Sequence, residues 1–261
     1  MSSELSAERR VVVSADRATV VDVVSRRLLD KLTRLTNEKE RVHLALTGGG
    51  AGIGVLAGVA DHPARDQVDW SRVHFWWSDE RFVPQQDAER NDLQARAALL
   101  DVLDVPEENI HSIASTDSGL SAEEAAERYS EELARFADDT SGLRWPSFDV
   151  CLLGVGPDAH IASLFPDRDE IRVSDSGAVA VHDSPKPPPT RVTLTRPVIN
   201  ASQRVWLVLT GAEKASALGL ALAGASYLSV PAAGAKGRRS TLFFVDVDAA
   251  AEVPEELIDP D

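Results

Sequence analysis

Short runs of apolar residues, rich in β-branched and aromatic side chains, recur along the chain and predict β-strands. The runs cover residues 11–13, 42–46, 73–77, 148–153, 192–194, 205–209 and 242–247. Several are apolar without alternation, as in central strands that helices cover on both faces. The pattern therefore predicts a sheet with a buried middle.

Apolar residues three or four positions apart predict helices between these strands, because such positions share one helix face. The clearest stripes are Val20, Val24, Leu28, Leu32 and Leu35; Leu93, Ala97, Leu100 and Leu103; and Tyr129, Leu133 and Phe136. Ser121 and Glu124 precede the last stripe with the spacing of a capping box. Since strands and helices alternate, we expect an α/β fold with a mostly parallel, Rossmann-like open sheet and helices on both faces.

We expect one domain over residues 1–261, with mobile ends at 1–10 and 251–261. Of the 261 residues, 43% are hydrophobic, which is enough for a large core. The run from Lys186 to Pro189 cannot be helical. Because patterned sequence resumes at Arg191, we interpret this run as an ordered turn or lid and not as a linker.

The charge balance limits the kinds of partner. A formal net charge of −15 disfavours binding to nucleic acid or to an anionic membrane. A small anionic substrate is compatible with it, because screening over about 8 Å lets a few local cations define a site. No apolar stretch approaches the roughly 20 residues of a membrane span, so we expect a cytoplasmic monomer or small homo-oligomer. The single cysteine, Cys151, lies in an apolar run and is expected to have a packing role.

The first candidate site is a glycine-rich turn that follows the strand at 42–46. Thr47, Gly48 and Gly49 open the turn, and a helical pattern follows. Backbone N–H groups in such a turn can bind an anion such as phosphate at the positive end of the helix dipole. The alternative is a tight turn in which the glycines only supply unusual dihedral angles.

Two nucleotide-binding motifs fit this turn poorly. Gly52, Gly54 and Ala57 formally match a dinucleotide fingerprint, but the match begins several residues beyond the strand end. No Lys-Ser or Lys-Thr pair follows the glycines, which excludes the phosphate loop of nucleoside triphosphatases. We therefore expect no nucleotide cofactor.

Charged residues follow two further apolar strands. Asp79, Glu80 and Arg81 come after the strand at 73–77, and Asp158 and His160 lie in a glycine turn after the strand at 148–153. Ligands of open α/β sheets bind outside the carboxyl ends of the strands. Asp158 can orient the imidazole and stabilise its charged form, as a general base requires. Glu80 and Arg81 could instead pair with each other on a solvated surface.

Two cations, Arg191 and Lys214, lie beside strand ends and are candidates for binding an anionic substrate. Taken alone, such residues are more often solvated surface charges than ligands. The remaining histidines have no comparable context, and no group of Cys or His has the spacing of metal ligands. We therefore expect no metal site.

Three motifs occur in a characteristic order along the chain. They are Trp77-Ser78-Asp79-Glu80-Arg81, Gly154-x-Gly156-Pro157-Asp158-x-His160 and Thr210-Gly211-x-Glu213-Lys214. Together they resemble the 6-phosphogluconolactonase family, within a larger group that includes the glucosamine-6-phosphate deaminases. The resemblance implies a cofactor-free hydrolase that opens 6-phosphogluconolactone to 6-phosphogluconate in the oxidative pentose phosphate pathway.

The resemblance also implies roles for individual residues. His160 would deprotonate the attacking water, and Asp158 would hold the imidazole. Arg81, which we group with Asp79 in the catalytic set, would bind the phosphate or stabilise the developing oxyanion. The residues that would contact the phosphate are Thr47, Gly48, Gly49, Arg191 and Lys214.

The chain departs from the usual family pattern at a few positions. Ala159 stands where glycine is common, which strains the turn if a positive φ is needed. Ile161 stands where threonine is common. Gly50 and Ala51 replace the Ser or Thr of the phosphate turn, which leaves backbone N–H groups and cations to hold the phosphate.

Two other functions are compatible with parts of this pattern. A glucosamine-6-phosphate deaminase or isomerase would carry a proton-transferring Glu where this chain has Phe165, which cannot transfer a proton. A non-catalytic sugar-phosphate sensor would need the glycine turn and the cations but no base. His160 therefore distinguishes the sensor from the enzyme.

Overall fold

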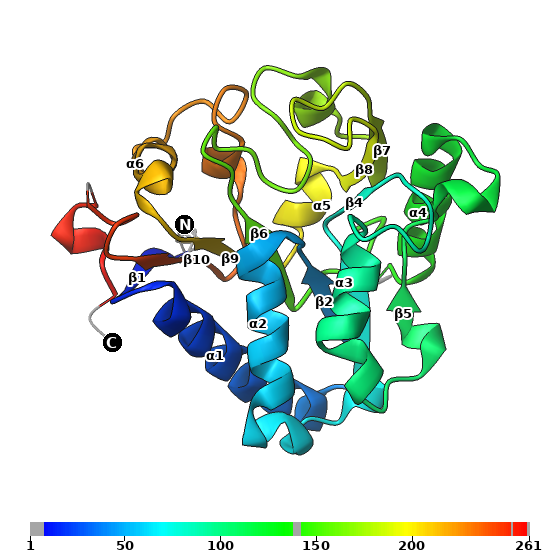
Figure 1. Cartoon of the computed structure of the whole chain (residues 1–261), viewed down its shortest axis with the longest axis horizontal. Helices are drawn as coiled ribbons and strands as arrows, with labels where there is room; N and C mark the ends of the chain where they lie inside the picture. The colour runs from blue at the N-terminus through cyan, green and yellow to red at the C-terminus, as the bar shows by residue number, and fades with distance from the viewer. Residues whose placement is uncertain (1–7, 138–141, 252, 260–261) are drawn as a thin grey trace.

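A computed structural model describes residues 8–137, 142–251 and 253–259 of the chain, which form an α/β fold around a parallel sheet (Figure 1). The seven strands of this sheet are all paired in parallel. In spatial order they are β1 (Glu8–Ser14), β10 (Ser240–Asp246), β9 (Arg204–Leu209), β6 (Val150–Gly154), β2 (Val42–Leu46), β3 (Val73–Trp77) and β5 (Ile110–His111). The predicted fold class is therefore confirmed.

Six α-helices lie among the described residues. They are α1 (Arg17–Glu38), α2 (Gly49–Asp61), α3 (Asn91–Ala98), α4 (Ala122–Arg135), α5 (Arg196–Asn200) and α6 (Ala215–Leu222). Helices α1, α2 and α3 lie side by side in one layer, and α4 packs against β7 (Ala178–Val181) and β8 (Arg191–Leu194) of a second sheet (Figure 1). The predicted stripes thus lie on helices α1, α3 and α4, although α3 ends at Ala98, earlier than the stripe suggests.

A second sheet, which the sequence pattern did not predict, is antiparallel and has three strands. It consists of β4 (Asp79–Arg81), β8 (Arg191–Leu194) and β7 (Ala178–Val181). The strand predicted at 192–194 belongs here and not to the parallel sheet. In its register Arg81 lies opposite Arg191, so this sheet joins two candidate segments that are far apart in the sequence.

Side-chain caps explain where two helices begin. Ser121 and Glu124 form the predicted capping box at the start of α4. Helix α3 has no side-chain cap of its own. Instead, the Glu80 carboxylate accepts hydrogen bonds from the backbone N–H groups of Asn91 and Asp92, at 2.7 and 2.8 Å. Glu80 therefore ties the start of α3 to β4, because it satisfies N–H groups that the helix leaves unpaired.

The core contains a cluster of rings around Trp76, which is fully buried. His111 stacks on Trp76 with ring centroids 3.8 Å apart, and Phe136 meets Trp76 edge-on at 5.3 Å. His74 Nδ1 lies 3.0 Å from His111 Nε2, and the indole N–H of Trp76 donates to His43 Nδ1. Three histidines to which the sequence assigned no role are thus part of the packed interior.

The described parts of the two chain ends are held in place. Residues 8–10, which we expected in a mobile end, pair with β10, and Ile258 forms a bridge with Val11. The mobility of the two ends stays a prediction, and residues 1–7, 252 and 260–261 lie outside the described part. Cys151 is buried in β6 as predicted. None of the described helices is long and apolar enough to cross a membrane.

Candidate active site

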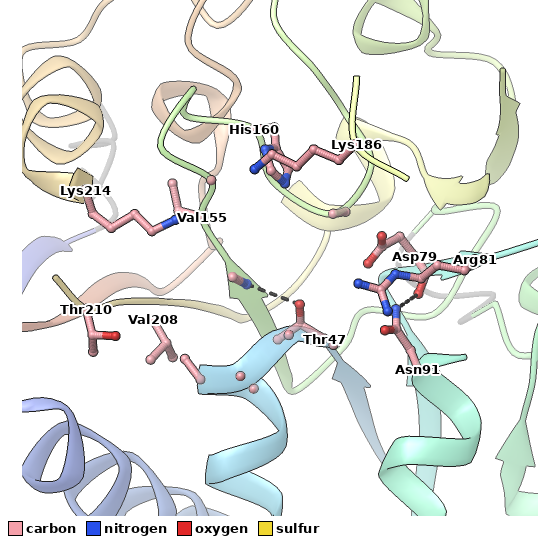
Figure 2. A pocket seen from close by; sticks show the side chains of 18 of the residues that line it. Thr47, Asp79, Arg81, Asn91, Val155, His160, Lys186, Val208, Thr210 and Lys214 are labelled. Atoms are coloured by element: carbon pink, nitrogen blue, oxygen red, sulfur yellow. Dashed lines mark hydrogen bonds between the residues drawn. The ribbon is translucent and has the colours of Figure 1, made fainter. Parts of the chain in front are cut away.

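A cavity of about 380 Å³ opens at the carboxyl ends of β2, β6 and β9, next to the start of α2 (Figure 2). Its position is the usual one for ligands of an open α/β sheet. Eight of the nine predicted site residues line it: Thr47, Gly48, Gly49, Asp79, Arg81, His160, Arg191 and Lys214. The ninth, Asp158, contacts the imidazole of His160.

Asp158 and His160 form a hydrogen-bonded pair. Asp158 Oδ1 lies 2.5 Å from His160 Nδ1. Because a carboxylate can only accept here, Nδ1 carries the proton and the lone pair of the neutral ring is on Nε2. Partial burial alone would raise the pKa of Asp158, but the hydrogen bond with His160 and the charges of His160 and Lys186 lower it to about 2. Asp158 is therefore ionised at neutral pH.

The turn that carries this pair is tight. A Cβ on Gly156 would come 2.0 Å from His160 Nδ1 and 2.3 Å from Asp158 Oδ1, so only glycine lets the pair lie against the backbone. Ala159 has φ 64°, in the left-handed region where a Cβ is strained. The strain expected from the departure at Ala159 is thus present, while the side chain itself is buried.

The glycine-rich turn places the start of α2 at the cavity. Gly48 is the N-cap residue of α2, and no side chain caps this helix. Its first N–H groups, which lack intrahelical acceptors, are therefore available to an anion. Thr47 Oγ1 accepts a hydrogen bond from Gly154 N at 3.2 Å, which joins β2 to β6 (Figure 2). The Thr47 hydroxyl keeps its own proton for a ligand.

Asp79 and Arg81 reach the cavity from β4. The Asp79 carboxylate is buried and accepts a hydrogen bond from Ser163 Oγ at 2.6 Å. Arg81 Nη1 donates to the backbone carbonyl of Glu89 at 2.6 Å, while its Nε has no partner among the described residues. Arg81 can therefore still donate to a ligand, whereas Asp79 already has a fixed partner.

Asn91, which we did not include among the predicted site residues, also lines the cavity. Its Nδ2 donates to the backbone oxygen of Asp79 at 2.8 Å (Figure 2). Its Oδ1 is buried and has no partner within the described structure. The signal that could have identified Asn91 is its place at the start of α3, where the Glu80 carboxylate fixes it.

Replacing Gly48 by alanine is expected to lower the free energy of unfolding by about 1–3 kcal/mol, the usual cost of forcing atoms into a packed region. The new Cβ would come 1.8 Å from Asn91 Oδ1, so Asn91 must rotate and lose its bond to Asp79. Urea denaturation would measure the change.

Gly54→Ala, within the same helix, is the matched control for this variant. Its Cβ would come 3.3 Å from a methyl group of Val21, and the higher helix propensity of alanine opposes that small clash. Equal effects of the two substitutions would contradict the role given to the Gly48–Asn91 contact.

Arg191 lines the cavity but is engaged differently from the phosphate ligand that we expected. It is buried, and its Nε donates to the carbonyl of Pro188 at 3.1 Å. Its Nη2 donates to the carbonyls of Lys186 and Pro187, at 3.0 and 3.1 Å. Most of its donors therefore hold the loop at 186–188.

Lys214 and Lys186 are the cavity's two lysines. Lys214 ends a short 3-10 helix, Ala212–Lys214, that follows β9. Burial and the charge of Lys186 lower the pKa of Lys214, which the carboxylates of Glu213 and Asp158 partly oppose. Lys186 was noted in the sequence only as part of the proline-rich run, because nothing in the sequence shows where that run folds.

No group of acidic, His or Cys side chains in the described part of the chain could hold a metal ion.

Comparisons with known proteins agree on one family. The family model for glucosamine-6-phosphate isomerases/6-phosphogluconolactonase matches residues 15–244. A 6-phosphogluconolactonase of Streptomyces coelicolor is 44% identical over 253 residues, or 96% of this chain and 97% of that protein. One of Mycobacterium leprae is 44% identical over 246 residues, or 94% of this chain and 98% of that protein.

Solved structures give the same result for the fold. A 6-phosphogluconolactonase from Thermotoga maritima superimposes with a TM-score of 0.78 at 29% identity, covering 92% of this chain and 100% of the other. The motif resemblance, the parallel sheet with its site at the strand ends, and these matches agree. The chain belongs to the glucosamine-6-phosphate isomerase/6-phosphogluconolactonase family.

Proposed function

We propose that this protein is a 6-phosphogluconolactonase, which hydrolyses 6-phosphogluconolactone to 6-phosphogluconate in the oxidative pentose phosphate pathway. The observation that carries the proposal is the pair of Asp158 and His160 beside a cavity whose other groups suit a phosphate. The names of the relatives from Streptomyces and Mycobacterium support the same substrate.

The geometry suits attack of water on a lactone carbonyl. His160 Nε2 takes a proton from a water molecule, and the water oxygen forms a bond to the carbonyl carbon. The π electrons of the carbonyl move onto its oxygen to give an oxyanion. When this intermediate collapses, the bond from carbon to the ring oxygen breaks and the imidazolium returns its proton to that oxygen. Asp158 stabilises the imidazolium and keeps Nε2 directed at the reaction.

The phosphate end of the substrate is assigned to the start of α2 and to Lys214. Gly48 and Gly49 contribute backbone N–H groups, Thr47 contributes its hydroxyl, and Lys214 contributes a charge. Arg81 has donors left for the phosphate or for the oxyanion. Arg191 has few donors left, so we no longer place it among the main phosphate ligands.

A deaminase-like reaction fits this site less well. Phe165 is buried, and its ring packs on His160 with centroids 4.6 Å apart. A phenyl ring in this position cannot transfer a proton to open a sugar ring. A sugar-phosphate sensor would leave the hydrogen-bonded pair of Asp158 and His160 without a purpose.

The protein's expected setting follows from the same chemistry. We propose that it acts in the cytoplasm on a free sugar phosphate, as a monomer or small homo-oligomer, without a nucleic-acid partner. The net charge of −15 supports the last point, because nucleic acid is itself anionic.

Purified protein is expected to hydrolyse 6-phosphogluconolactone faster than the spontaneous reaction, both before and after treatment with a chelator. Gluconolactone without phosphate should react with a kcat/KM at least about 10²-fold lower, because the loss of charge-assisted hydrogen bonds at about 1.5–3 kcal/mol each removes the main source of affinity. Acid release at constant pH would measure both rates against a protein-free blank. Equal kcat/KM values would contradict the assignment of a phosphate site.

A further inference from the structure

Lys186 belongs to the reacting end of the cavity. Its Nζ lies 3.8 Å from Asp158 Oδ1, the oxygen that also contacts His160 Nδ1. Figure 2 shows its side chain reaching toward His160, while Lys214 enters from the other side, near Val155. Lys186 is therefore a cation next to the proposed base, apart from the cation assigned to the phosphate.

The ammonium group of Lys186 is available to a ligand. At 3.8 Å its contact with Asp158 is an ion pair without a hydrogen bond. Its side chain is 41% exposed, and no acceptor among the described residues lies within hydrogen-bonding distance of Nζ. The three N–H donors of Lys186 therefore have no hydrogen-bond acceptor among the described residues, and one of them can be directed at a substrate oxygen.

Arg191 fixes the backbone that carries Lys186. Three of its hydrogen bonds end on the carbonyls of residues 186, 187 and 188, at 3.0 to 3.1 Å. The same guanidinium lies 3.9 Å from the buried Asp79 carboxylate and donates to Ser163 Oγ at 3.4 Å. Asp79 and Ser163 therefore hold the Arg191 guanidinium, and Arg191 in turn holds the loop that carries Lys186. A lysine at position 191 could not bridge three carbonyls, because its ammonium lacks the planar fork.

We propose that Lys186 is a catalytic residue that stabilises the oxyanion formed on the lactone carbonyl, and that Arg191 is a positioning residue acting through it. The inference rests on the proposed lactonase reaction. Water held by His160 Nε2 must attack a carbonyl carbon close to that nitrogen, so the carbonyl oxygen develops its charge near the same ring. A cation there stabilises the transition state more than the neutral ground state, and it therefore acts on kcat.

Lys186→Met is expected to lower kcat by about 10- to 10²-fold, with less than a threefold change in KM. The expected loss of kcat is smaller than the roughly 10²–10³-fold loss for a buried oxyanion donor, because Lys186 is partly exposed. Lys214→Met is the matched control, and it should mainly raise KM. Lys236→Met, at an exposed position outside the cavity, should match the wild type.

Arg191→Lys tests the positioning role through a double-mutant cycle. If Arg191 acts through Lys186, the double variant should have nearly the kcat of Lys186→Met alone, since effects within one unit do not add. If the two single substitutions lower kcat by factors that multiply in the double variant, or if Arg191→Lys raises KM, then Arg191 binds the phosphate directly. If Arg191→Lys fails to fold, the comparison of Lys186→Met with the wild type and with Lys214→Met still tests the proposal, because Lys186 is partly exposed and its substitution should not disturb the fold.

The outcomes separate this proposal from the proposed function. Wild-type protein without turnover above the blank would contradict the lactonase assignment. An active wild type whose Lys186→Met variant keeps its kcat, or changes only in KM, would overturn the role of Lys186 and leave the lactonase assignment in place.

Discussion

Replacing His160 by asparagine is expected to lower kcat by roughly 10²–10⁴, the range for loss of a positioned general base, while the protein stays folded. The imidazole lies at the cavity, and its Nδ1 is bonded to Asp158, so Nε2 alone can accept the proton of water. Stopped assays with corrected blanks would measure kcat, and a thermal melt would check folding.

Asp158→Asn is the companion variant, and it should slow the reaction less than the loss of the imidazole. The amide can still contact the ring, but it no longer stabilises the imidazolium and can favour the wrong tautomer. A folded His160→Asn protein with the kcat of the wild type would rule out the mechanism and would require another base.

Lowering the pH from 7 to 4.5 is expected to reduce the free energy of unfolding by about 2 kcal/mol through His74 alone, because each pKa unit corresponds to about 1.36 kcal/mol and pH 4.5 still lies above the pKa of the folded state. Burial, with the charges of His111 and Arg41, lowers the pKa of His74 from 6.5 to about 4. Burial and neighbouring charges lower the pKa of His43 to about 3. Between pH 6.5 and pH 4 the unfolded chain therefore binds more protons than the folded one. The stabilisation is complete above pH 6.5 and is lost as the pH falls toward 4.

His74→Gln isolates this contribution from that of the carboxylates, which also titrate in acid. The quantity to compare is the difference between unfolding free energies at pH 7 and pH 4.5, from urea denaturation at each pH. This difference should be smaller in His74→Gln than in the wild type, whatever the variant's stability at pH 7. An unaltered difference in His74→Gln would show that the ring cluster does not control acid stability.

The hydrophobic pattern predicted the parallel sheet well because its strands are buried on both faces. The strands at 42–46 and 73–77 have the predicted boundaries. Strand β4 was missed because Asp79, Glu80 and Arg81 are charged, and its place is decided by pairing with β8. Helix α3 ends at Ala98, before the end of its apolar stripe. The spacing of apolar residues shows which face of a helix is buried but not the residue at which the helix ends.

The site residues that the sequence could identify are those in local motifs. Asp158 and His160 lie two positions apart in one turn, and their contact follows from that spacing. Lys186 is distant in sequence from Asp158, the site residue that it contacts, so no local pattern shows its place in the site. The charge of Arg191 is visible in the sequence but its hydrogen bonds to residues 186–188 are not, because they depend on how that loop folds back.

The sequence by itself thus determined the α/β class, the glycine turns at the ends of β2 and β6, and the contact between Asp158 and His160. These features depend on the periodic pattern of buried apolar residues and on contacts between residues a few positions apart in the sequence. Tertiary structure alone decided that β4 and β8 pair, that Glu80 holds α3 and Asn91, and that Arg191 holds the loop of Lys186 beside Asp158. The physical reason is that such contacts depend on how strands and loops fold back on one another, which packing of the whole core decides and which leaves no periodic trace in the sequence.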